Sequence, residues 1–100
     1  MKGVSIVAAA ILTVLAGQAS ASQALAQSKG CLNCHKIEKK FVGPALKDVS
    51  NKYKGNPNAE MAIAGVIPIG SKGVWGVVPM PPQKLSPDEA RTLARWILSL

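Results

Sequence analysis

The feature that most constrains this chain of 100 residues is one short run, Cys31-Leu32-Asn33-Cys34-His35. It contains both cysteines and the only histidine of the sequence. A thioredoxin-like redox pair would need βαβ surroundings, and the sequence has no strand pattern that predicts them. A structural zinc site needs four ligands, whereas only three candidate ligands cluster here. A plain disulfide would leave His35 without a role.

Haem attachment gives all three side chains a role. Two thiols one helical turn apart can add to the two vinyl groups of a haem, while the adjacent imidazole is delivered to the iron. We therefore predict one covalent haem c, held by Cys31 and Cys34, with His35 as an axial iron ligand. Because the chain has no second histidine, a bis-His site within it is excluded. Met80, Met61, a lysine amine or an open position remain for the other axial site.

Met80 is the candidate that we favour for this second position. It lies within residues 78–82 (VPMPP), where three prolines fix φ and exclude both a helix and an interior strand. Such a segment is a stiff strap that can hold one side chain against the iron. Met61 instead falls at apolar spacing on an expected helix, where core packing is the usual role of methionine. The sequence thus predicts His35 and Met80 as the iron ligands.

The beginning of the chain has the layout of a secretory signal. Lys2 precedes an apolar run over residues 4–16, and the small residues 19–21 (ASA) form a cleavage site. The run is shorter than the roughly 20 residues that cross a bilayer as a helix. We predict a signal peptide over residues 1–21 and a periplasmic domain over residues 22–100. Cleavage after Ala19 or Ala26 is an alternative.

The periodicity of the remaining chain favours an all-α fold. Apolar spacing predicts helices over residues 23–29 and 45–54, and a third from about residue 58 to 67, where Pro68 is expected to end it. Residues 68–84 hold four prolines and three glycines, which predicts a long loop.

The last helix has the clearest start signal. Ser86 can serve as N-cap, Pro87 fits the first helical position, and Glu89 completes a capping box. The exported part has only 79 residues and four aromatic side chains, so its core needs support beyond its own side chains. A large apolar cofactor at the centre would supply that support.

Taken together, these motifs resemble those of the class I c-type cytochromes, in particular the small bacterial cytochrome c-551 and c-552 group. The matching pieces are residues 29–35, 42–45, 47–49, 70–76, 79–82 and 88–98. The resemblance implies the small class I cytochrome c fold, with four or so short helices wrapped around one covalent haem.

The resemblance also implies roles for several single residues. The Pro44 carbonyl should accept a hydrogen bond from the ring of His35, and the Trp75 indole should reach a haem propionate, with plain core packing as the alternative for Trp75. Trp96 should pack against the first helix.

Two positions depart from the group. Gln83 stands where asparagine is frequent beside the ligating sulfur. Val66 stands where a basic residue near the propionates is frequent, and Lys72 could compensate for its charge.

These features predict a one-electron carrier and not an enzyme, because filled axial positions oppose substrate binding. The resemblance suggests a cytochrome bc1-type donor and a nitrite reductase or terminal oxidase as acceptor. Two alternatives stay open. One is a haem enzyme or gas sensor with a labile distal ligand, and the other is a fixed cytochrome subunit of a larger oxidoreductase.

The charge balance favours anionic partners. Lysine and arginine number 12 against 5 acidic residues, and eleven basic residues remain without Lys2. Most of the lysines fall between Lys29 and Lys54, which suggests steering onto an acidic docking face. A plain solvated surface is the alternative. No nucleic-acid recognition motif is present, and we expect a monomer that engages acidic redox proteins.

Overall fold

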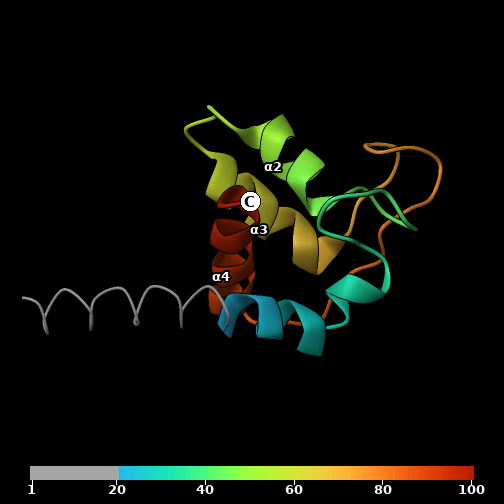
Figure 1. Cartoon of the computed structure of the whole chain (residues 1–100). Helices are drawn as coiled ribbons and strands as arrows, with labels where there is room; N and C mark the ends of the chain where they lie inside the picture. Colours follow the sequence, from blue (N-terminus) through green and yellow to red (C-terminus); the bar gives the residue numbers. More distant parts are fainter. Residues whose placement is uncertain (1–20) are drawn as a thin grey trace, which may run out of the picture.

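The computed structural model describes residues 21–100, in which helices are joined by long loops (Figure 1). A helical segment over residues 21–28 is followed by four labelled elements. These are η1 (Cys31–Asn33), α2 (Leu46–Tyr53), α3 (Ala59–Ile69) and α4 (Pro87–Leu98). Between residues 21 and 100 the one strand-like pairing is an isolated bridge that joins Ser71 to Met80. The predicted all-α class is confirmed.

The predicted signal peptide lies outside the described residues except for Ala21, so its cleavage stays a prediction. Among residues 21–100, no helix has the length and apolar character needed to cross a bilayer.

The start of α4 agrees with the sequence prediction. The Ser86 hydroxyl accepts a hydrogen bond from the Glu89 backbone N–H at 3.1 Å, and the Glu89 carboxylate accepts one from the Ser86 N–H at 2.9 Å. Pro87 occupies the first helical position. Two backbone N–H groups that the helix itself cannot satisfy therefore have partners, which stabilises this end of α4.

The core lies mainly between α3 and α4, and α2 also packs against α4. The buried apolar side chains form one cluster, made of Ala26, Leu46, Ile63, Ile67, Leu93, Ala94, Trp96 and Ile97. Trp96 thus shares a cluster with Ala26 of the N-terminal helical segment, as expected. The buried Ser50 hydroxyl donates to the Leu98 carbonyl at 3.3 Å, which ties α2 to the end of α4.

The predicted end of α3 was wrong. Pro68 lies inside the helix, which continues to Ile69. A proline in the last turn removes one backbone donor, but the ladder resumes because the Gly70 N–H donates to the Val66 carbonyl at 2.7 Å. The long loop therefore begins at Gly70, two residues later than predicted.

The predicted core position of Met61 was also wrong. The inward face of α3 carries Ala59, Ile63 and Ile67, which are spaced four residues apart. Met61 is two residues out of this register, which places it about 200° around the helix. It is 74% exposed.

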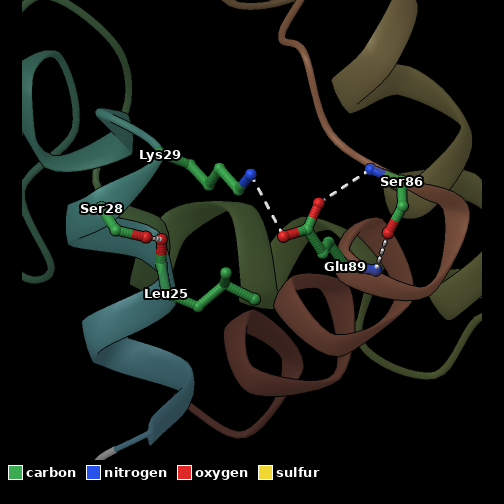
Figure 2. Close-up of polar contacts among 5 residues, drawn as sticks. All are labelled: Leu25, Ser28, Lys29, Ser86 and Glu89. Atoms are coloured by element: carbon green, nitrogen blue, oxygen red, sulfur yellow. Dashed lines mark hydrogen bonds and ion pairs between the residues drawn. The ribbon is translucent and has the colours of Figure 1, made fainter.

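An ion pair joins the N-terminal helical segment to the start of α4. Figure 2 shows the Lys29 ammonium reaching toward the Glu89 carboxylate, with 3.1 Å between Nζ and Oε2. The same carboxylate caps Ser86 through its other oxygen. The Ser86 backbone N–H, followed by Lys29, lowers the pKa of Glu89 from its ordinary value. One side chain thus caps α4 and holds the residue that precedes Gly30 and Cys31.

We expect Glu89→Gln to reduce the loss of stability in acid. Because the folded-state pKa of Glu89 is below its ordinary value of 4.5, its stabilising contribution is present above that value and is lost as the pH falls through the lower folded pKa. Glutamine keeps an acceptor for the Ser86 N–H but has no charge for Lys29. Thermal unfolding at pH 7 and about pH 3 should show a difference between wild type and variant that shrinks in acid. An unchanged difference would contradict this role, and Asp88→Asn, one residue away, serves as the control.

Candidate haem site

An open cavity, partly continuous with solvent, lies between the helices and the two long loops. The chemistry-bearing residues of the sequence analysis all line it, namely Cys31, Cys34, His35, Pro44, Trp75 and Met80. Most of the other lining side chains are apolar, and three helices contribute to them. These helices supply Val49 and Tyr53 from α2, Ile63, Val66 and Ile67 from α3, and Leu93, Trp96 and Ile97 from α4. The fold therefore brings Cys31 and Met80, which lie 49 positions apart, to the walls of one apolar space.

A tight turn sets the three residues of the CxxCH motif. Gly30 adopts a left-handed conformation with φ of 78°, which ends the preceding helical segment. The Cys31 carbonyl then accepts hydrogen bonds from the N–H groups of Cys34 and His35, at 3.3 and 2.9 Å. No disulfide joins Cys31 to Cys34, so both thiols are available to the vinyl groups of a haem. Burial raises the pKa of the Cys31 thiol above its ordinary value, so this group is protonated at neutral pH.

The imidazole of His35 is oriented by a backbone carbonyl. Its Nδ1 lies 2.8 Å from the Pro44 oxygen. Because a carbonyl oxygen can only accept, Nδ1 must carry the proton and Nε2 must carry the free lone pair. This is the hydrogen bond that the family resemblance implied. It leaves Nε2 as the nitrogen able to bind a metal, and it increases the basicity of that atom.

Gly43 has a role at this site that our sequence analysis did not recognise. A Cβ at this position would lie 2.8 Å from His35 Cε1 and 3.0 Å from Nδ1, closer than real side chains approach. The Gly43 N–H also donates to the Cys34 carbonyl at 2.8 Å. The imidazole therefore rests against bare backbone. The only sequence signal is the glycine directly before Pro44, which is compatible with many kinds of turn.

Backbone contacts also hold Met80. Its N–H and carbonyl pair with the carbonyl and N–H of Ser71, at 2.9 and 3.0 Å. Gly70 has a φ of 77°, and a Cβ there would lie 2.4 Å from the Met80 oxygen. Only glycine satisfies both conditions, so residues 70 and 71 fix the base of the strap. The roles of Gly70 and Ser71 cannot be predicted from the sequence, because the pairing joins two positions nine residues apart.

Trp75 lies at the edge of the cavity and is 37% exposed. The Lys52 ammonium lies 4.8 Å from the centre of its ring, which is a cation–π distance. The end of α2 thus contacts the loop that carries Trp75.

Gln83 and Val66, the two positions that depart from the cytochrome c-551 and c-552 group, both line the cavity. Gln83 donates through Nε2 to the Pro81 carbonyl at 2.8 Å. Lys72, by contrast, is exposed and is not one of the lining residues.

The residues present fit a covalently attached haem. The space has apolar walls, as a porphyrin requires, and it is bordered by two thiols for the vinyl groups. His35 offers a nitrogen lone pair of fixed tautomer, and Met80 offers a thioether. Imidazole and thioether are both known axial ligands of haem iron.

Comparison with known proteins agrees with this geometry. Residues 19–100 match the family model described as cytochrome c. The chain belongs to the cytochrome c family. It is 47% identical over 95 residues to cytochrome c-551 of Pseudomonas aeruginosa, with 95% of this chain and 91% of that protein covered. It is 51% identical over 86 residues to cytochrome c-552 of Hydrogenobacter thermophilus, covering 86% and 88%.

A solved structure gives the same result. The crystal structure of cytochrome c552 from Nitrosomonas europaea matches with a TM-score of 0.76 and 48% identity, covering 78% of this chain and 98% of that one. Cytochromes c of this family carry one covalently attached haem c, and Cys31 and Cys34 fit its CxxCH motif. The predicted family, fold and cofactor are confirmed.

We expect Gly43→Ala to impair haem incorporation. The added methyl group would overlap the His35 ring, so the ring must rotate away from the Pro44 carbonyl or the backbone must shift, at a cost of about 1–3 kcal/mol. Gly65→Ala is the matched control, because a Cβ at Gly65 meets no atom within 4 Å. The ratio of haem absorbance to protein should fall in Gly43→Ala alone. Equal ratios in both variants would show that the ring does not depend on this close approach.

Proposed function

We propose that this protein is a periplasmic one-electron carrier whose haem iron is ligated by His35 and Met80. The observation that carries the proposal is the convergence of an imidazole of fixed tautomer and a strapped thioether on the cavity that the two thiols border. Its similarity to cytochromes c-551 and c-552 supports the same conclusion. The predicted export signal supports the periplasmic location.

The proposed roles of the chain are to hold two ligands and to exclude others. A bound haem supplies one-electron chemistry, because its iron alternates between Fe(II) and Fe(III). His35 is held by Pro44 and Gly43, and Met80 is held by Gly70 and Ser71, so neither ligand relies on a flexible side-chain contact. Rigid ligands limit the structural change that accompanies a change of charge. Filled axial positions leave no place for a substrate, which favours a carrier over an enzyme.

We expect Met80→Ala to abolish the weak far-red sulfur-to-iron band of the ferric protein, to lower the reduction potential and to open the iron to carbon monoxide. The reason is that alanine has no sulfur and leaves an axial position empty. Met61→Leu is the control, since Met61 is exposed and lies outside the lining of the cavity. Optical spectroscopy and redox titration measure the outcome. If Met61→Leu removed the band and Met80→Ala kept it, the ligand assignment would be reversed. Carbon monoxide binding by the unmodified protein would favour a sensor or enzyme.

The charges of the described residues suggest which partners fit. Four basic residues form ion pairs. The pairs are Lys29–Glu89, Lys47–Glu38, Arg91–Asp88 and Arg95–Glu60. Only one acidic residue, Asp48, stands outside them. Within residues 21–100, seven further basic residues form no ion pair with an acidic side chain, namely Lys36, Lys39, Lys40, Lys52, Lys54, Lys72 and Lys84. This unbalanced positive charge favours redox proteins with acidic docking faces.

We expect electron transfer to an acidic acceptor, such as a nitrite reductase or terminal oxidase, to slow as ionic strength rises from about 0.01 to 0.15 M. Over that range the Debye length falls from about 30 to 8 Å, which screens steering. Lys36→Glu should slow transfer more than Lys54→Glu, because Lys36 directly follows His35. Lys29 is a poorer probe than its position suggests, because its reversal also breaks the contact with Glu89. Stopped-flow kinetics measure the bimolecular rate constant of electron transfer. A rate constant that changes neither with ionic strength nor in Lys36→Glu would show that the lysines do not steer the partner and are only a solvated surface.

A further inference from the structure

The outward face of α3 is apolar along its whole length. Met61 is 74% exposed, Ile69 is 73% exposed, and the exposed Gly65 lies midway between them. These three residues, four positions apart, form one stripe, and no residue of α3 after Glu60 has a polar side chain. A surface helix ordinarily carries charged or polar residues on this face, as α2 and α4 do here. The stripe therefore has the composition of a contact surface.

The stripe is separate from the haem site. None of its three residues lines the cavity, whereas Ile63 and Ile67 on the other side of the helix do. A redox partner docked on the stripe would have α3, which is roughly 10 Å thick, between itself and the cavity. Electron transfer favours close approach, so the stripe is a poor docking site for a redox partner.

We propose that the α3 stripe (Met61, Gly65 and Ile69) packs against the same stripe of a second copy of this chain, with the two helices antiparallel. A two-fold axis through Gly65 places Met61 of one protomer against Ile69 of its partner, because both lie four residues from the glycine. A Cβ at Gly65 would meet nothing within 4 Å, so the space there is open to the partner's backbone. Small residues at such a crossing allow two helices to approach closely. The stripe is thus complementary to itself.

The charges around α3 agree with this arrangement. The stripe carries no charge, and Glu60 beside it is paired with Arg95 of α4. An antiparallel contact leaves Glu60 to its own Arg95, because this carboxylate is already paired. It also sets the helix dipoles in opposite directions, which is favourable. The lysines without acidic partners still repel the two copies at longer range, so this dimer should strengthen as salt increases.

The contact should be weak. An α3 of 11 residues is roughly 16 Å long, and one helix pair of this length buries less than the roughly 1,200 Å² of a stable interface. We therefore expect a dissociation constant on the order of 1 mM, so that dilute protein is monomeric. The haem site of each copy stays accessible to a redox partner in such a dimer, because the α3 stripe does not line the cavity.

The test is a concentration series of the haem-loaded protein, from about 0.05 to 5 mM, followed by NMR diffusion and amide chemical shifts at low and high salt. Diffusion should slow with concentration, and the shifts should concentrate on α3. Met61→Gln should raise the dissociation constant about tenfold because it places an amide in an apolar contact, whereas Met61→Leu should leave it nearly unchanged. Gly65→Leu should fold, since the position is open, but should block the close approach.

The alternatives give distinct results. Shifts confined to the haem loops, association that weakens with salt, or Gly65→Leu that associates as tightly as wild type would each overturn the proposal. An anionic lipid surface is the other candidate for an apolar helix in a basic protein. Sedimentation with phosphatidylglycerol vesicles that depends on Met61, without self-association, would assign the stripe to lipid and overturn the dimer.

Discussion

A central space that the side chains leave unfilled is the constraint on which the rest of this structure depends. Ile63, Ile67, Leu93 and Ile97 belong to the buried core and also line the cavity, so the core and the haem site share the same walls. In a domain of about 80 residues, the hydrophobic core by itself contributes only a few kcal/mol to the free energy of unfolding. The haem of this family is therefore part of the hydrophobic core as well as the redox centre. This explains how four aromatic residues suffice for the whole chain.

Because the core is shared with a cofactor, the ligand residues are positioned by backbone more than by packed side chains. His35 takes its orientation from the carbonyl of Pro44 and its clearance from Gly43. Met80 takes its position from the two-way pairing with Ser71 and from the clearance at Gly70. Main-chain groups have few degrees of freedom, so each contact fixes a ligand at small entropic cost. A substitution at one of these glycines would change the site without removing any atom that touches the haem.

The parts of this molecule that follow from local rules could be predicted from the sequence. The CxxCH run, the strap of prolines and the capping box each specify their geometry within a few residues. The parts that failed depend on tertiary packing. The helix α3 is apolar on every face, so periodicity gives no indication of which side turns inward, and Met61 was assigned to the core although it is exposed. Pro68 stayed within the helix because it lies in the last turn, where it removes one backbone donor while the Gly70 N–H still reaches the Val66 carbonyl. The contacts of Gly43 and Ser71 join separate loops, and no spacing rule indicates them.

Net charge is likewise an incomplete guide to how the surface behaves. The acidic residues Glu60, Asp88 and Glu89 all form pairs at or beside α4, so this side of the molecule is close to electrically balanced. Five of the seven uncompensated lysines instead lie in residues 36–54, which follow the haem-attachment motif and include α2, and the other two, Lys72 and Lys84, lie in the loop between α3 and α4. A steering field therefore arises next to the site that must approach a redox partner, while the neighbourhood of α3 is left with little field of its own. Apolar contact through Met61, Gly65 and Ile69 and electrostatic attraction through the unpaired lysines therefore depend on different residues.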